Sequence, residues 1–166
     1  MNPQLRIAGV VKESIVDGPG IRLVVFAQGC RHHCQGCHNP ATHDFSGGKL
    51  VDIETILDEM QKNPLLDGIT LSGGEPFEQP QAFAALARRA RQLGYHVIAY
   101  SGYRYETLIA NKDQQQLLEH TDLLVDGKFD ITQKSLLLKF RGSKNQRIID
   151  LNQSRLQNQM ILSELN

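Results

Sequence analysis

Three cysteines of this 166-residue chain lie close together, at Cys30, Cys34 and Cys37, and the sequence contains no others. Three neighbouring thiolates form a soft-ligand site, and four thiolates are the usual set that holds a 4Fe-4S cluster. A cluster held by only three thiolates keeps one iron open to an outside ligand. The spacing C-x3-C-x2-C therefore predicts an iron–sulfur site that binds a further molecule.

Two other uses of the cysteines have to be considered. A disulfide framework needs an even number of cysteines and an oxidising compartment, and three cysteines leave one unpaired. Zinc is the stronger alternative, because a nearby histidine would complete a closed Cys3His site. The candidate histidines are His32, His33, His38 and His43. The spacing favours iron–sulfur over zinc but leaves both open.

Composition and charge exclude several classes of protein. Lys plus Arg and Asp plus Glu each number 18, so the formal net charge is zero. That balance predicts no nucleic-acid partner and no contact with an anionic membrane surface. The N-terminus lacks the layout of a signal peptide, and no apolar run approaches the roughly 20 residues of a membrane helix. Clustered thiols in such a chain indicate a reducing, cytoplasmic location.

The elements that must position the cysteines alternate between strand and helix patterns. Beta-rich runs predict strands over residues 5–11, 21–27, 69–71, 96–100, 123–125 and 147–151. Apolar residues at helical spacing, with capping and stop signals, predict helices over about 53–60, 80–94, 105–110 and 113–120. Strands and helices alternating about every 25 residues predict an α/β fold with a mainly parallel sheet. We assign residues 1–151 to one domain and expect a loosely packed tail over 152–166.

Four polar or glycine-rich segments follow predicted strands, and the carboxyl ends of parallel strands share one edge of a sheet. They are the cysteine loop and residues 72–76, 101–102 and 126–128. In the second segment, Gly73 and Gly74 would let the backbone approach a ligand closely, and Glu75 offers a carboxylate to an ammonium group. Each segment alone is more typical of an ordinary loop, but a zinc site used only for folding would not require all four to converge.

Together these motifs resemble the radical S-adenosylmethionine (SAM) superfamily, in which the C-x3-C-x2-C run is followed by Gly-Gly-Glu after the next strand. Residues 17–22 (DGPGIR), 28–30 (QGC) and 37–40 (CHNP) are similar to motifs of the glycyl-radical activating enzymes. The run FRGSKNQRIID at 140–150 resembles the C-terminal signature of one subgroup, the anaerobic ribonucleoside-triphosphate reductase activating proteins.

The likeness covers residues from about 9 to 151. Most superfamily members have an aromatic residue before the third cysteine, where this chain has Gly36. Glycine is common there in the reductase-activating subgroup, so the departure favours that subgroup.

The resemblance implies a partial (β/α) barrel of the radical SAM type. It implies that the three cysteines bind three irons of a 4Fe-4S cluster, while the amino and carboxylate groups of SAM chelate the fourth. The residues expected to bind SAM are Gly73, Gly74, Glu75, Ser101, Asp126 and Lys128. Those expected to contact a protein partner are Asp17, Gly18 and Arg22.

The implied activity is reductive cleavage of SAM and formation of a glycyl radical on the large subunit of the anaerobic reductase, with a flavodoxin or ferredoxin as the electron donor. Three alternatives stay open. They are an activating enzyme of the pyruvate formate-lyase type, a radical SAM enzyme acting on a small molecule, and a zinc-binding regulatory domain without catalysis.

Overall fold

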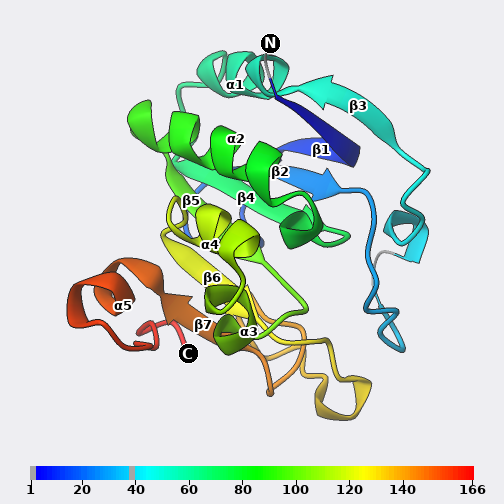
Figure 1. Ribbon diagram of the computed structural model, residues 1–166, viewed down its shortest axis with the longest axis vertical. Coiled ribbons are helices and arrows are strands. Elements are labelled where there is room, and N and C mark those ends of the chain that lie inside the picture. The colour runs from blue at the N-terminus through cyan, green and yellow to red at the C-terminus, as the bar shows by residue number, and fades with distance from the viewer. Residues whose placement is uncertain (1–2, 38–39) are drawn as a thin grey trace.

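The computed structural model describes residues 3–37 and 40–166 (Figure 1). Its strands are β1 (Gln4–Ser14), β2 (Arg22–Ala27), β3 (Lys49–Asp52), β4 (Gly68–Gly73), β5 (His96–Tyr100), β6 (Leu123–Asp126) and β7 (Arg147–Asp150). Its α-helices are α1 (Ile53–Gln61), α2 (Pro80–Gln92), α3 (Tyr105–Ile109), α4 (Lys112–Leu118) and α5 (Leu151–Gln157). No helix in the described part of the chain combines the length and apolarity needed to cross a bilayer.

The seven strands form one sheet in the order β3-β1-β2-β4-β5-β6-β7. The four central strands, β2, β4, β5 and β6, are parallel, as the sequence predicted. The outer pairings, β3 with β1, β1 with β2, and β6 with β7, are antiparallel, so the sheet as a whole is mixed. The outer strands can pair in the antiparallel direction because such neighbours need no helical crossover, whereas the parallel pairs are joined through helices.

The strand β3 is the one element of the sheet that the sequence analysis missed. It has only four residues, and two of them, Lys49 and Leu50, are exposed. A short, half-exposed strand at the edge of a sheet carries little of the apolar alternation on which a prediction depends.

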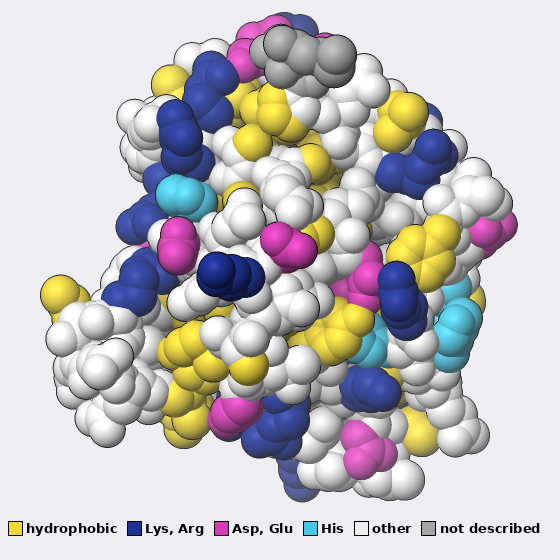
Figure 2. Space-filling view, in the orientation of Figure 1, with side chains coloured by type: hydrophobic (Ala, Val, Ile, Leu, Met, Phe, Trp, Pro, Cys, Tyr) yellow, Lys and Arg dark blue, Asp and Glu magenta, His cyan; other side chains and the backbone are white. Residues whose placement is uncertain are grey.

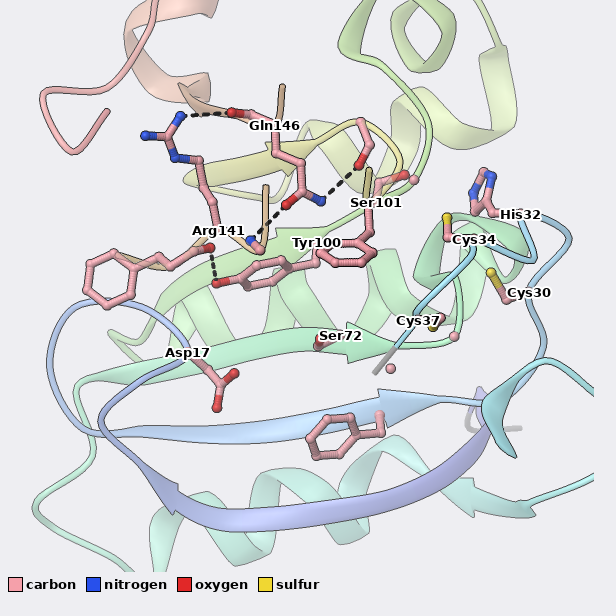
Figure 3. A pocket seen from close by; sticks show the side chains of 18 of the residues that line it. Asp17, Cys30, His32, Cys34, Cys37, Ser72, Tyr100, Ser101, Arg141 and Gln146 are labelled. Atoms are coloured by element: carbon pink, nitrogen blue, oxygen red, sulfur yellow. Dashed lines mark hydrogen bonds between the residues drawn. The ribbon is translucent and has the colours of Figure 1, made fainter. Parts of the chain in front are cut away.

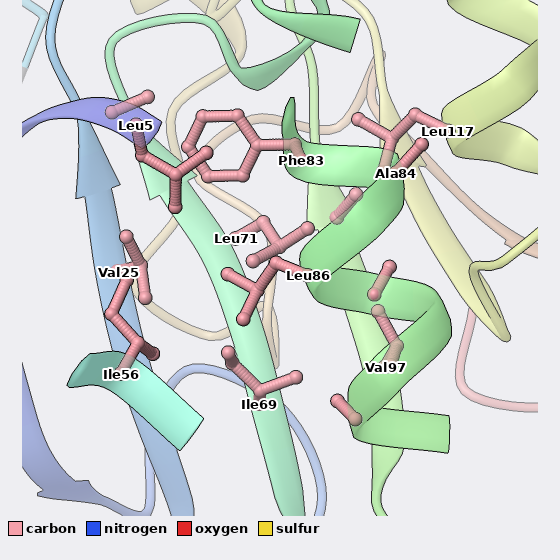
Figure 4. Packing of buried hydrophobic residues seen from close by; sticks show 14 of the residues in the cluster. Leu5, Val25, Ile56, Ile69, Leu71, Phe83, Ala84, Leu86, Val97 and Leu117 are labelled. Atoms are coloured by element: carbon pink, nitrogen blue, oxygen red, sulfur yellow. The ribbon is translucent and has the colours of Figure 1, made fainter. Parts of the chain in front are cut away.

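Helices cover one face of the sheet, and most of the buried apolar residues lie between the two layers. Figure 4 shows Ile69 and Leu71 of β4 packed against Phe83 and Leu86 of α2. Because side chains alternate across a strand, the neighbouring residue Ser72 faces the other side of the sheet, where a cavity lies. Helices outside and a cavity inside form the partial (β/α) barrel that the sequence predicted.

Hydrogen bonds hold the C-terminal tail against β7, although most of its side chains are exposed. The tail is therefore attached at more points than the sequence led us to expect. The Asp150 carboxylate caps α5 by accepting a hydrogen bond from the Gln153 N–H (3.0 Å). The chain then turns back along β7, where the Asp150 N–H donates to Ile161 (2.9 Å) and the Ser163 N–H to Ile148 (2.8 Å). The tail thereby covers the sheet edge that β7 would otherwise leave exposed.

Charges on the surface are mixed. In Figure 2, Lys and Arg side chains are spread over the visible face with Asp and Glu side chains among them. The Lys and Arg side chains gather most along its upper left edge, and both signs occur elsewhere on the face, in agreement with the zero net charge of the sequence.

Candidate functional site

A cavity of about 430 Å³ lies on the face of the sheet opposite the helices (Figure 3). Four segments that follow parallel strands line it: the cysteine loop after β2, residues 72–74 at the end of β4, residues 101–102 after β5, and Gly127 after β6. The predicted convergence of the four segments at one sheet edge is therefore confirmed. Figure 3 shows Tyr100 in the middle of this cavity, the cysteines toward one end and Asp17 toward the other.

Cys30, Cys34 and Cys37 all line the cavity and keep their thiols. Burial raises the pKa of the Cys30 thiol above its ordinary value, so a bound cation has to displace the proton before the sulfur can serve as a thiolate ligand. Three thiols at the wall of one cavity fit the ligand set of a 4Fe-4S cluster with an open iron.

The histidines do not complete a site for a single metal ion in the part of the chain that the structure describes. No group of three or more His, Cys, Asp and Glu side chains among residues 3–37 and 40–166 is placed to hold one ion. His38, a candidate zinc ligand, and Asn39, part of the CHNP motif, lie outside the described residues.

The two glycines after β4 allow close contact between two backbones. The Gly74 N–H donates to the Ala27 carbonyl (2.8 Å), which extends the pairing of β4 with β2. A Cβ on Gly74 would lie 2.6 Å from the Gly29 carbonyl oxygen, and Gly73 has a φ of +91° that favours glycine. The sequence predicted that these glycines admit a ligand, and the structure shows that they admit the backbone leading into the cysteine loop.

The carboxylate of Glu75 is fully buried and has four partners within the protein. Oε1 accepts hydrogen bonds from Ser101 Oγ (3.0 Å) and Gly102 N (2.8 Å) and lies 2.6 Å from His32 Nε2. Oε2 accepts from Phe77 N (3.2 Å), the first turn of the 3-10 helix η2 (Pro76–Glu78). Glu75 and Ser101, both predicted to bind SAM, are thus brought together and bonded to each other.

A second carboxylate of the same segment, Glu78, also contacts the cysteine loop. It pairs with Arg31 (Nε–Oε2 3.1 Å) and accepts a hydrogen bond from the Tyr103 hydroxyl. Burial and this bond raise the pKa of Tyr103, so the phenol stays protonated. Glu75, just before η2, and Glu78, its last residue, therefore hold the cysteine loop at two points.

Asp126 and Lys128 lie apart from the cavity wall. The Asp126 carboxylate is buried, where it accepts hydrogen bonds from Tyr105 N (2.7 Å) and Arg147 Nε (3.0 Å). The Lys128 side chain is exposed, and its carbonyl accepts from Asn145 Nδ2 (2.8 Å). A role for this pair in binding SAM remains a prediction.

The segment expected to contact a partner, residues 17–22, lies at the start of β2, the opposite end of that strand from the cysteines. Asp17 lines the cavity. Arg22 is buried, and its guanidinium donates to Thr70 Oγ1 (2.8 Å) and to the carbonyls of Pro19, Ile69 and His96. Burial lowers the pKa of Arg22 to about 10. Gly18 packs against Ile98 and Arg22, so partner contact through Gly18 and Arg22 remains a prediction that this placement does not support.

Sequence reasoning assigned no site role to residues 129–146, between Lys128 and β7, which form a further wall of the cavity. Its lining residues are Phe129, Leu138, Phe140, Arg141, Gly142 and Gln146. Gln146 organises this wall by donating to the Gly127 carbonyl (3.0 Å) and accepting from Gly142 N (2.9 Å). The FRGSKNQ run at 140–146 was the available signal, because it identified the subgroup but was not placed near the cysteines.

Two polar atoms of the cavity wall lack a hydrogen-bond partner among the described residues: His43 Nε2 and Arg141 Nε. Buried polar groups in native proteins are nearly all hydrogen-bonded, and the exceptions often mark a place where a ligand binds. A guanidinium beside a cavity suits a carboxylate. These atoms and the three thiols fit a zwitterionic ligand such as SAM beside a cluster.

Comparisons with known sequences agree with this chemistry. Residues 16–149 match the family model described as "4Fe-4S single cluster domain". The chain is 33% identical over 142 residues to the anaerobic ribonucleoside-triphosphate reductase-activating protein of Enterobacteria phage T4, covering 80% of this chain and 86% of that protein. The protein of the same name from Escherichia coli K12 is 36% identical over 140 residues, covering 80% and 90%.

Two further similarities are less complete. The pyruvate formate-lyase-activating enzyme of Clostridium pasteurianum is 37% identical over 126 residues, covering 72% of this chain, and the chain spans 50% of that enzyme's length. Among solved structures, that of QueE from Escherichia coli matches with a TM-score of 0.44 and 15% identity, covering 60% of this chain and 52% of the other.

Proposed function

The chain belongs to the 4Fe-4S single cluster domain family and to the family of anaerobic ribonucleoside-triphosphate reductase-activating proteins, and we propose that it generates a glycyl radical on the large subunit of such a reductase. The observation that carries this proposal is the group of three thiols at the wall of a cavity on the carboxyl edge of the sheet. A zinc-binding regulatory domain would not need that cavity.

The proposed ligands of the cluster are Cys30, Cys34 and Cys37. When bound there, the cluster supplies a low-potential electron that cleaves SAM to methionine and a 5′-deoxyadenosyl radical, which takes the Cα hydrogen of the target glycine. Gly73 and Gly74 line the cavity beside the cysteine loop, and their backbone is proposed to contact the amino group of SAM. Arg141, whose Nε has no partner among the described residues, is proposed to pair with its carboxylate.

The walls of the cavity contribute by excluding water. Phe26, Tyr100, Phe129 and Phe140 present aromatic rings to it. Burial raises the pKa of Tyr100, whose hydroxyl donates to the Phe140 carbonyl (2.7 Å), so this side chain stays neutral. A neutral, largely apolar wall suits the chemistry of a radical, which must be kept from solvent.

The substrate is proposed to be a glycine in a flexible segment of the reductase, because a glycyl radical is stabilised by both flanking peptide groups and has no side chain to hinder approach. Asp17, at the end of the cavity away from the cysteines, is our candidate for contact with that segment (Figure 3). A flavodoxin or ferredoxin is proposed to reduce the cluster.

Activation of pyruvate formate-lyase is the second candidate, favoured by the 37% identity to the C. pasteurianum enzyme. The run FRGSKNQRIID at 140–150 favours the reductase, because it resembles the signature of the reductase-activating subgroup. The two functions differ in the protein substrate and share the chemistry of the cluster.

Electron paramagnetic resonance separates them. The anaerobically reconstituted, reduced protein is mixed with SAM and with either the reductase large subunit or pyruvate formate-lyase. We expect a glycyl-radical doublet with the reductase only, and none when Cys34→Ala replaces the wild type. A doublet with pyruvate formate-lyase alone would reverse the assignment. Formation of 5′-deoxyadenosine without a doublet would indicate a small-molecule substrate, and bound zinc without iron would reject the enzyme.

A further inference from the structure

Glu75 holds the cysteine loop on both sides of Cys30. Its backbone N–H donates to the carbonyl of Gly29 (2.8 Å), the residue before Cys30. Its carboxylate lies 2.6 Å from Nε2 of His32, two residues after Cys30. One residue at the end of β4 therefore fixes the chain entering and leaving the first cysteine.

The imidazole of His32 occupies a slot that the end of β5 forms around it. Its side chain is 6% exposed. The ring meets that of Tyr103 edge to face, with centroids 4.5 Å apart. Gly102 packs so closely against it that any Cβ at that position would collide with the ring. A slot that needs glycine on one side and an aromatic ring on the other is built to hold this side chain in one place.

The carboxylate of Glu75 is enclosed by the protein and does not line the cavity. An ionised carboxylate offers about four acceptor sites. Ser101, Gly102 and His32 contact Oε1, Phe77 contacts Oε2, and the side chain is 0% exposed. An ammonium group from a ligand in the cavity would have to displace one of these contacts and reach a group that the protein encloses.

We propose that Glu75 is a positioning residue, which locks the cysteine loop to the ends of β4 and β5 through His32, and that it does not bind the amino group of SAM. This inference rests on the proposed cluster chemistry and is independent of which protein is activated. It predicts that Glu75 and His32 act as one unit in retaining the cluster.

Three variants test the unit: His32→Ala, Glu75→Ala and the double variant. After anaerobic reconstitution, iron and sulfide per chain and the rate of cluster loss are measured by metal analysis and visible absorbance. A hydrogen bond to a charged group is worth enough that each single variant should lose its cluster about tenfold faster than wild type. The double variant should lose it no faster than Glu75→Ala, because that single variant already removes the contact with His32.

Glu75→Gln separates positioning from binding of SAM. A Gln side chain can still accept from Ser101 and Gly102, so we expect cluster content near that of wild type. We also expect the affinity for SAM to stay within about twofold of the wild-type value, because no contact between Glu75 and the ammonium group of SAM is lost. For the same reason, SAM should cause the same change in the electron paramagnetic resonance spectrum of the reduced cluster. A loss of SAM affinity of about tenfold with full cluster content would overturn the proposal and make Glu75 a ligand of the ammonium group.

Glu78→Gln is the matched control. Glu78 follows the same strand and also contacts the cysteine loop, but its partner Arg31 is 72% exposed. Exposed pairs contribute little, so the rate of cluster loss should change by less than about twofold. An equal effect of Glu78→Gln and Glu75→Ala would show that any change beside the loop destabilises the cluster, and would reject a specific role for Glu75.

Folding and function are checked separately. If urea unfolding shows that His32→Ala does not fold, Gly102→Ala takes its place, because the added Cβ displaces the His32 ring and leaves Glu75 unchanged. Wild-type cluster retention in both variants would overturn the inference. Failure of the wild type itself to take up iron would instead reject the proposed function.

Discussion

Two buried charged side chains, Arg22 and Glu75, join the same three strands at opposite ends of the sheet. Arg22, at the start of β2, donates to Thr70 and Ile69 of β4 and to the carbonyl of His96 in β5. Glu75, just after β4, contacts the cysteine loop that follows β2 and the residues that follow β5. Both are almost completely buried, at 1% and 0% exposed.

The difference lies in what each side chain holds. Most acceptors of Arg22 belong to strands, whose positions the sheet already fixes. Most partners of Glu75 belong to segments beyond the strand ends, which the sheet does not fix. Hydrogen bonds of a buried charged side chain should therefore stabilise the fold at the Arg22 end of the sheet. At the Glu75 end they should instead hold the site in its arrangement.

The variant Arg22→Met should show the largest loss of stability. It removes a buried guanidinium and leaves the carbonyls of Pro19, Ile69 and His96 without this donor. Unsatisfied buried acceptors make a loss of about 3 kcal/mol in the free energy of unfolding reasonable. At this chain length that corresponds to a melting temperature lower by roughly 6–12 °C. Urea and thermal unfolding of the protein before reconstitution measure both.

The comparison also requires that Arg22→Met leave the site intact. Iron content per folded chain should equal that of wild type at a temperature where the variant is folded. A variant as stable as wild type, or one that folds but loses its iron, would remove the distinction between the two ends of the sheet.

The variant Gly74→Ala should show the second-largest loss of stability. It should also disturb the site. Its Cβ would lie 2.6 Å from the Gly29 carbonyl oxygen and 2.8 Å from that of Ala27, both of them backbone atoms. Overpacking of this kind typically costs about 1–3 kcal/mol. Because the strain falls on the entrance to the cysteine loop, we also expect less iron per chain after reconstitution.

The matched control is Gly9→Ala in β1, where an added Cβ meets nothing within 4 Å. Alanine lowers the conformational entropy of the unfolded chain, so that variant should be at least as stable as wild type. Equal behaviour of the two alanine variants would show that β2 and β4 can separate at their carboxyl ends without consequence for the site.

The variant Thr70→Val removes one contact of Arg22 and should have a smaller effect. The Thr70 hydroxyl accepts from Arg22 Nε (2.8 Å) and donates to the Asp17 carbonyl (2.7 Å). Losing it leaves a buried donor without a partner, at a cost of about 1–2 kcal/mol in unfolding free energy. Thr132→Val, at an exposed hydroxyl that bonds to Asp130, is the control and should change stability by less than about 0.5 kcal/mol. Equal losses in the two variants would contradict the role given to Thr70.

Much of the fold could be predicted because its parallel centre carries strong sequence patterns. Apolar strand runs and helical spacing placed β2, β4, β5, β6, α1 and α2. The antiparallel direction of β7 and the position of the tail depend on pairings distant along the chain, such as Ile149 with Leu162, which have no local pattern. Tertiary pairing, rather than local propensity, decides such elements.

The sequence predicted which residues lie at the site better than it predicted what each of them contacts. Spacing indicated the cysteines, and the rule for parallel strands brought Gly73, Gly74 and Ser101 to the same edge. Glu75 illustrates the limit, because a carboxylate in a sequence is equally suited to a ligand or to a protein partner. Only the fold shows that His32, 43 positions earlier in the chain, is its neighbour.

Arg147 links a buried and an exposed carboxylate. It therefore offers a test of whether an exposed ion pair stabilises the fold less than the buried contacts of Arg22 do. Its guanidinium bonds to Asp126, which is buried, and to Glu106 (2.8 Å), whose side chain is 58% exposed. The hydrogen bond from Arg147 lowers the pKa of Glu106 from 4.5 to about 2. Because the pKa is lower in the folded state, the pair stabilises the fold above pH 4.5, and this stability is lost as the pH falls toward 2.

Solvent screening at this exposure limits the contribution of Glu106 to at most about 1 kcal/mol. Urea unfolding at pH 6.5 and pH 3.5 should therefore show a slightly smaller loss of stability on acidification in Glu106→Gln than in wild type, with other carboxylates cancelling in the comparison. A larger difference, approaching the effect of Arg22→Met, would mean that an exposed pair can stabilise this fold as strongly as a buried one. The contrast between Arg22 and Glu75 would then have to rest on the position of their partners alone, since burial would no longer distinguish a strong contact from a weak one in this protein.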